Sequence, residues 1–142
     1  MTIVMLLNKM KYLLDTNTLI SKLSETTKGR NNLCVIHDVA REYEFPRKAK
    51  GLIQRSGIDV IELSRKHYAK LTTVLSVHAD NLGLINLYEG TGAADVMMLA
   101  FVLSERDNPA GLFPVSYTLV TKDKELTKIA QLYSISCTQN LN

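Results

Sequence analysis

The sequence predicts an α/β fold with a mostly parallel central sheet. Short apolar runs recur along the chain, and segments with helical character separate them. Strands that alternate with helices form crossover units, and such units produce a parallel sheet. A long segment near the middle of the chain is apolar on all sides, as expected for a helix in the core. The expected strands are residues 10–14, 33–36, 58–63, 117–121 and 134–138.

Helices are expected between these strands. We expect a helix over Thr18–Leu23 and another that Asp38 caps and that continues through Phe45. Pro46 lacks a backbone donor, so it either kinks that helix or begins the next one. The remaining expected helices are 47–55, 65–77 with Ser64 as cap, 93–103 and 122–132. Loops are expected at residues 24–32 and near Pro109, and breaks at 81–83 and 90–92, with a short helix between the two breaks.

Length and composition are those of one soluble domain. We expect the 142 residues to form a single domain, 1–142, in the cytoplasm, without a signal peptide or membrane span. The net charge of +3 is compatible with a nucleic-acid partner but is no evidence for one. Cys34 and Cys137 show no metal or redox spacing, and two buried free thiols are favoured over a disulfide.

Asp95 is the single charged residue in the apolar segment 93–103. An ionised carboxylate in apolar surroundings costs several kcal/mol unless it is paired or bound to a cation. Only Thr91 is a polar neighbour within reach on the same helix. Asp95 therefore either caps its own helix or meets a counter-charge from elsewhere, such as a metal ion.

Asp15 and Asp123 each follow an expected strand and precede an expected helix. Taken singly, each is a common helix N-cap. In parallel sheets, however, ligands bind at the carboxyl ends of the strands. With Asp95 the two would form a carboxylate cluster, which a cation would have to neutralise. Oxygen ligands favour Mg²⁺ or Mn²⁺, which can activate a water molecule against a phosphodiester.

Other catalytic systems fit the sequence poorly. The histidines at positions 37, 67 and 78 show no zinc-ligand spacing, and there is no nucleophile elbow, phosphate-binding loop or CxxC motif. Basic residues are either a solvated face or contacts for a phosphate backbone, namely Arg41, Arg47, Lys48, Lys50, Arg55, Lys122 and Lys124. Tyr43 and Phe45 could stack on bases, although core packing is favoured for Phe45.

Four segments together resemble the motifs of PIN domains. KYLLDTNTLI resembles the first motif, with Asp15 after a strand, and HDVAREYEF resembles the second, a V-x-x-E pattern that ends at Glu42. GAADVMMLAFV resembles the third through Asp95, and LVTKDKEL resembles the fourth, with Thr121 and Asp123. Each motif is weak alone, but the four occur in order over residues 11–137.

The resemblance implies a three-layer α/β/α sandwich around a sheet of about five parallel strands. It implies one or two Mg²⁺ or Mn²⁺ ions held by Asp15, Glu42, Asp95 and Asp123, with Thr121 and also Asn17 as candidates to orient water or a carboxylate. The implied activity is hydrolysis of RNA by a metal-activated water. The implied partners are the RNA substrate, an antitoxin and a second copy of the chain, as in toxins of the VapBC kind.

Several alternatives stay open. Glu44 is a second candidate for the second acid, although Glu42 fits the V-x-x-E register. An apolar stretch precedes Lys11 and is either an added strand, a start-site artefact or a dimer contact. An RNA-processing nuclease without an antitoxin, and a PIN-like module that binds RNA or protein without cleaving, are the alternative functions. The presence of all four acids favours an enzyme.

Overall fold

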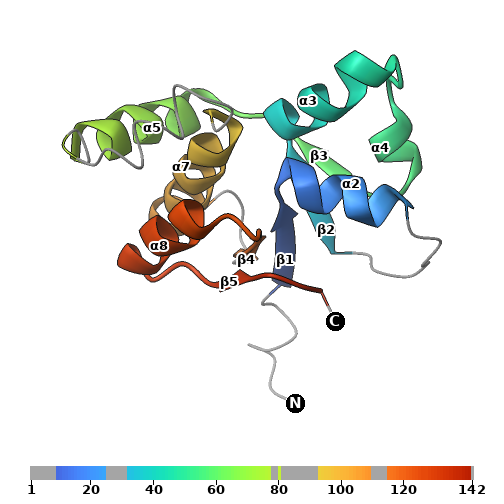
Figure 1. Ribbon diagram of the computed structural model, residues 1–142. Coiled ribbons are helices and arrows are strands. Elements are labelled where there is room, and N and C mark those ends of the chain that lie inside the picture. The colour runs from blue at the N-terminus through green and yellow to red at the C-terminus, as the bar shows by residue number, and fades with distance from the viewer. Residues whose placement is uncertain (1–8, 25–31, 78–79, 81–92, 110–114, 142) are drawn as a thin grey trace.

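Five parallel strands form one sheet in the order β3-β2-β1-β4-β5 (Figure 1). The computed structural model describes residues 9–24, 32–77, 80, 93–109 and 115–141. Its strands are β1 Lys9–Leu14, β2 Leu33–Ile36, β3 Asp59–Ile61, β4 Val115–Val120 and β5 Cys137–Thr138. β1 lies at the centre, pairing with β2 on one side and along its whole length with β4 on the other. The strand order reverses between β1 and β4, where a binding crevice is expected in such sheets.

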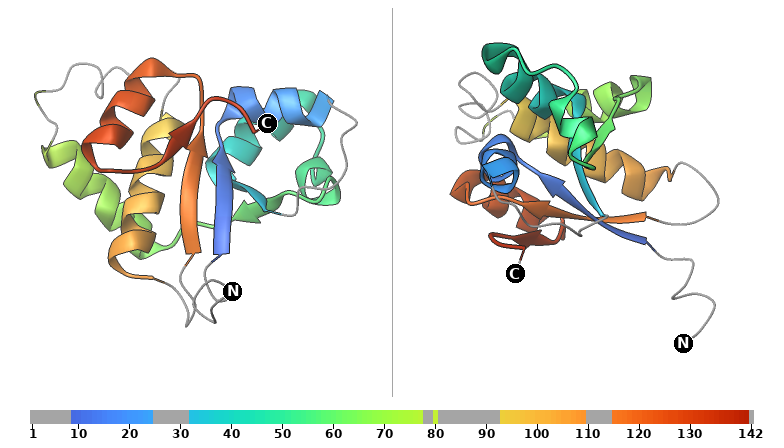
Figure 2. Two further views of the ribbon diagram at one scale, coloured as in Figure 1. Left: turned by 90° about the horizontal axis from the view of Figure 1, so that it is seen from below. Right: turned by 90° about the vertical axis from the view of Figure 1, so that its right-hand side faces the viewer.

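Helices connect the strands and cover the sheet on both faces, which confirms the three-layer α/β/α arrangement (Figure 2). They are α2 Thr16–Ser24, α3 His37–Arg47, α4 Leu52–Arg55, α5 Arg65–Val77, α7 Ala93–Asp107 and α8 Lys124–Leu132. In Figure 1, α2, α3 and α4 gather toward the β2–β3 half, and α5, α7 and α8 toward the β4–β5 half. The carboxyl ends of β1 and β4 lead directly into α2 and α8.

The core is built on β1, β4 and α7. Leu13, Leu14, Leu119 and Val120 are fully buried, because central strands of a parallel sheet are covered on both faces. In α7 every side chain from Val96 to Leu103 is buried, which confirms the prediction of a core helix. The helix continues four residues beyond the expected end, to Asp107.

The predictions for the helices around Pro46 were partly wrong. Ile36 occupies the N-cap position of α3 and makes no side-chain cap, whereas Asp38 lies in the first turn. Pro46 falls in the last turn of α3 and does not open the next helix. The expected single helix 47–55 is interrupted, because Lys48 (φ 52°) and Gly51 (φ 78°) adopt left-handed conformations that a right-handed helix excludes.

The other elements differ from expectation mainly at their ends. α2 begins two residues before Thr18, and α8 begins at Lys124, because Asp15 and Asp123 act as caps. The third and last strands shorten to Asp59–Ile61 and Cys137–Thr138. The expected breaks at 81–83 and 90–92, the short helix between them and the apolar stretch 1–8 lie outside the described residues, as does most of the loop 24–32.

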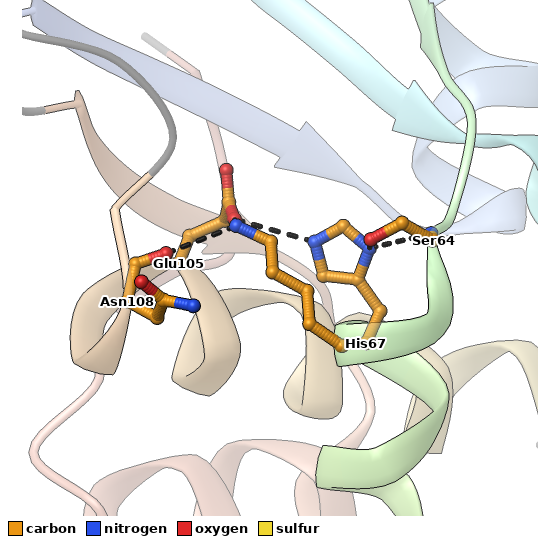
Figure 3. Close-up of polar contacts among 5 residues, drawn as sticks. Ser64, His67, Glu105 and Asn108 are labelled. Carbon is orange, nitrogen blue, oxygen red and sulfur yellow. Dashed lines mark hydrogen bonds and ion pairs between the residues drawn. The ribbon is translucent and has the colours of Figure 1, made fainter.

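A polar cluster joins α5 to the end of α7, and Figure 3 shows the His67 ring between Ser64 and Glu105. His67 Nδ1 accepts hydrogen bonds from the Ser64 N–H (2.8 Å) and hydroxyl (3.2 Å), so Nε2 carries the hydrogen that faces Glu105 Oε2 (3.3 Å). Lys66 also pairs with Glu105 and donates to the Asn108 carbonyl. The Ser64 N–H lies closer to Nδ1 than the Ser64 hydroxyl does. We therefore interpret Ser64, His67 and Glu105 as a structural cluster, here called the interhelix clamp, which caps α5 and joins it to α7.

The two cysteines are free, as the sequence predicted. Cys34 is fully buried on β2, and burial raises the pKa of its thiol to about 12. Cys137 is only partly buried, on the edge strand β5, although burial also raises its pKa. We expect a disulfide reagent at pH 8 to label about one thiol per folded chain, at Cys137, and a second only after unfolding. Labelling of Cys34 in the folded protein would contradict this burial.

Candidate active site

Asp15 is held at the end of β1 through both of its carboxylate oxygens. Oδ1 accepts the backbone N–H of Thr18 at 2.9 Å, and Oδ2 accepts the hydroxyl of Thr121 at 2.6 Å. The predicted N-cap is therefore confirmed, and it uses only one of the two oxygens. With 6% exposure Asp15 is nearly buried, so its position is fixed by hydrogen bonds from two different elements.

Thr121 connects Asp15 to Asp123 across the ends of β1 and β4. Its hydroxyl donates to Asp15 and accepts the backbone N–H of Asp123 at 3.0 Å. Asp123 in turn caps α8, accepting the N–H of Leu126 at 2.9 Å. The register that pairs Leu14 with Val120 places these residues side by side. The second predicted cap is thus also confirmed.

Glu42 reaches the same edge of the sheet from α3. Its Oε2 accepts the hydroxyl of Thr16, the first residue of α2, at 2.6 Å. Glu44 points elsewhere, because its carboxylate accepts the backbone N–H of Ile53 in α4 at 3.4 Å. This geometry favours Glu42 over Glu44 as the second acid of the site.

Asp95 lies in the first turn of α7, among buried side chains, and is itself only partly buried. It makes no hydrogen bond or ion pair with any residue that the structure describes, so the alternative of a helix cap finds no support there. Burial, followed by the negative charges of Asp15, Asp123 and Glu42, raises the pKa of Asp95 from 3.8 to about 7. The four acids therefore lie within electrostatic reach of one another.

The resulting site is open and acidic. Within the described part of the chain, no three Asp, Glu, His or Cys side chains converge closely enough to hold one ion. The donor set nevertheless suits a hard divalent cation, because it consists of carboxylate oxygens and includes one, Asp95, that has no partner among the described residues. Burial is the largest cause of the raised pKa of Asp95, and a bound cation would offset the second cause, the negative charges of Asp15, Asp123 and Glu42.

Two threonines of the site were missed in the sequence, where Asn17 was the expected helper. Thr16 holds Glu42, and the Thr18 hydroxyl donates to the Val120 carbonyl at 3.1 Å, tying α2 to β4. Asn17 is exposed and hydrogen-bonds to none of the four acids among the described residues. The signal was present in the DTNT segment, because threonine hydroxyls on either side of Asn17 can reach a neighbouring helix or strand.

The other residues singled out in the sequence are distributed around the site. Phe45 was expected in the core, but its side chain is 84% exposed, so that expectation was wrong. Tyr43 is partly buried, and the Arg47 guanidinium lies 4.3 Å from its ring centre. His37 lies 3.9 Å from Glu62, His67 belongs to the interhelix clamp, and His78 is outside the described residues. The seven basic side chains named above are exposed.

No helix in the described ranges is long and apolar enough to cross a membrane. No protein-family model matches the sequence, and no curated protein matches it. A solved structure does: the PIN domain of T. brucei RRP44, with a TM-score of 0.52 and 15% sequence identity. The match covers 92% of this chain and 76% of that chain. The strand order and this structural likeness together show that the chain has the fold of a PIN domain.

Proposed function

We propose that the chain is a divalent-cation-dependent endoribonuclease whose catalytic site comprises Asp15, Glu42, Asp95 and Asp123. The observation that carries the proposal is Asp95, a partly buried carboxylate that makes no hydrogen bond or ion pair with any described residue and whose pKa is raised by burial and by the charges of Asp15, Asp123 and Glu42. Such an arrangement destabilises a protein unless it serves a ligand. A purely structural role, or a module that binds without cleaving, gives no reason to keep four acids together.

The four carboxylates would bind one or two Mg²⁺ or Mn²⁺ ions, which supply a water of lowered pKa and neutralise charge on the phosphodiester. The protein's own contribution is positioning. Thr121 holds Asp15 in a fixed orientation through the hydrogen bond from its hydroxyl. Thr16 holds Glu42 in the same way. The exposed Lys122 and Lys124 flank Asp123 and are suited to hold the flanking phosphates of the RNA.

The biological setting remains a proposal drawn from motif resemblance. The order of its motifs favours a toxin of the VapBC kind, which an antitoxin would inhibit and which would form homodimers. An RNA-processing nuclease without an antitoxin is the alternative. A short reading frame with a DNA-binding pattern directly upstream of the gene would favour the toxin, and its absence would favour RNA processing.

Cleavage of single-stranded RNA in the presence of Mn²⁺ tests the enzymatic proposal. We expect the wild-type protein to cut a labelled RNA oligonucleotide, EDTA to stop the reaction, and Asp15→Asn to lower the rate by at least about 10²-fold. Asp59→Asn is the matched control, because Asp59 is an exposed aspartate at the beginning of β3, away from the site. Equal rates for wild type and Asp15→Asn, in preparations free of other nucleases, would refute the assignment.

A further inference from the structure

A cleft of about 380 Å³ opens beside the acidic site, along the exposed face of α3. It is lined by Asp38, Arg41, Glu42, Phe45 and Ala94. Two of these residues connect it to the site, since Glu42 is one of the four acids and Ala94 immediately precedes Asp95. A molecule that reacts at the acids therefore has room to extend into this cleft.

Phe45 is the most exposed large apolar side chain among the described residues, at 84%. Burial of a phenylalanine side chain stabilises a protein, so an exposed ring on a cleft wall forgoes that gain. Unlike the neighbouring Tyr43, which carries Arg47 on its face, Phe45 makes no ring contact with a described residue. Its faces are available for stacking.

Arg41 supplies a positive charge on the same wall. It is exposed and forms no hydrogen bond or ion pair with any described residue, although Asp38 and Glu42 lie on the same helix. The basic side chains of Arg47, Lys48, Lys50 and Arg55 continue the positive surface from α3 to α4. Glu44, which would reduce this charge, is turned toward the Ile53 backbone.

A planar aromatic face beside an unpaired guanidinium suits one chemical class of ligand, a nucleotide with its base unstacked. Bases of single-stranded RNA stack on aromatic side chains while arginine contacts the phosphate. Asp38 adds an acceptor for a sugar hydroxyl or a base amine. We infer that Phe45 and Arg41 form a nucleotide subsite that binds single-stranded RNA next to the scissile phosphate. The inference rests on the proposed ribonuclease function.

The sequence contains no tryptophan, so Phe45→Trp introduces a single fluorescent reporter. We expect titration with a short single-stranded RNA, in EDTA and low salt to prevent cleavage, to quench its emission. Tyr68→Trp is the matched control, because Tyr68 is 51% exposed on α5 and lines no part of the cleft. The subsite is supported if RNA quenches the tryptophan emission of Phe45→Trp but not that of Tyr68→Trp. It is overturned if anisotropy shows that Phe45→Trp binds the RNA while its tryptophan emission stays unquenched.

Loss of either side chain should weaken binding without affecting folding, since both are exposed. We expect Phe45→Ala to lower RNA affinity about 5- to 100-fold and to raise KM more than it lowers kcat. Arg41→Gln should make the slope of the logarithm of the binding constant against the logarithm of the salt concentration shallower by somewhat less than one, which corresponds to the loss of one phosphate contact. Arg65→Gln, on α5, should leave this slope unchanged.

The outcomes separate this inference from the proposed function. If Phe45→Ala and Arg41→Gln bind and cleave RNA like the wild type while Asp15→Asn is inactive, the subsite is wrong and the ribonuclease assignment stands. That result would instead identify the α3 surface as a candidate protein-binding face. If the wild type neither binds nor cleaves RNA, both proposals fail.

Discussion

Asp95→Asn is expected to abolish cleavage and, unusually for a change next to the core, to stabilise the metal-free protein. The pKa of Asp95 is about 7 in the folded protein and 3.8 in its ordinary environment. Between these two pH values the folded state binds the proton more tightly than the unfolded state. Stability of the wild type therefore falls as pH rises from about 4 to 7, and the full penalty is present at pH 8.

The amide removes the charge and with it the penalty. Because Asp95 is partly exposed and solvent screens its charge, we expect a gain of about 1–3 kcal/mol in the free energy of unfolding at pH 8. The gain should vanish near pH 4. Denaturation in EDTA at both pH values measures it, with Asp59→Asn as the control. A variant less stable than the wild type at pH 8 would show that Asp95 has a structural partner.

Cation binding provides a second test of Asp95→Asn, in which the variant should be stabilised less than the wild type. Millimolar Mg²⁺ or Mn²⁺ should raise the melting temperature of the wild type by mass action, since the ion binds the folded state. Asp95→Asn, which has one anionic ligand fewer, should show a smaller shift. Equal shifts for the two proteins would place the bound cation away from Asp95.

The second large effect is expected at Thr121. Thr121→Val removes the donor to Asp15 and the acceptor for the Asp123 N–H while preserving the shape of the side chain. The Asp15 carboxylate is nearly buried and the Asp123 N–H is partly buried, so we expect a loss of about 2–4 kcal/mol in stability and of at least about 10²-fold in cleavage rate. Thr121→Ser, which retains the hydroxyl, should keep most of both.

Thr118→Val is the matched control for this prediction. Thr118 lies on β4, three residues before Thr121, and is also buried, but its hydroxyl donates to the sulfur of Met10, a weak acceptor. We expect a small change in stability and an unchanged cleavage rate. Similar losses for the two valine variants would mean that burial of threonine on β4, rather than the contact with Asp15, causes the effect.

The sequence contained most of the information for the sheet and for three of the four acids. Asp15 and Asp123 were predicted as strand-end caps because capping depends on neighbours within three residues, and both caps are present. The buried helix around Asp95 was predicted because ten apolar neighbours leave few other placements. In each case the interaction that decides the structure is between residues close in the sequence, so the pattern along the chain is sufficient to predict it.

Predictions failed where the deciding interaction is distant or where the backbone departs from regular geometry. The contact from Thr16 to Glu42 joins residues 26 positions apart, which no local pattern reports. The left-handed conformation of Lys48 ended a helix that its composition favoured continuing. Phe45 was expected in the core because apolar side chains are usually buried, but α3 turns it toward the cleft.

The central pairing of β1 with β4 also determines when activity can arise during synthesis. Asp15 and Thr121 are 106 residues apart, and parallel strands can pair only after the whole intervening chain is available. A growing chain that ends between Glu42 and β4 carries Asp15 and Glu42 but has neither Thr121 to orient the first acid nor Asp123 to complete the set. If the chain cleaves RNA, the ribosome that makes it is therefore exposed to the complete site only after the segment that carries Thr121 and Asp123 has emerged.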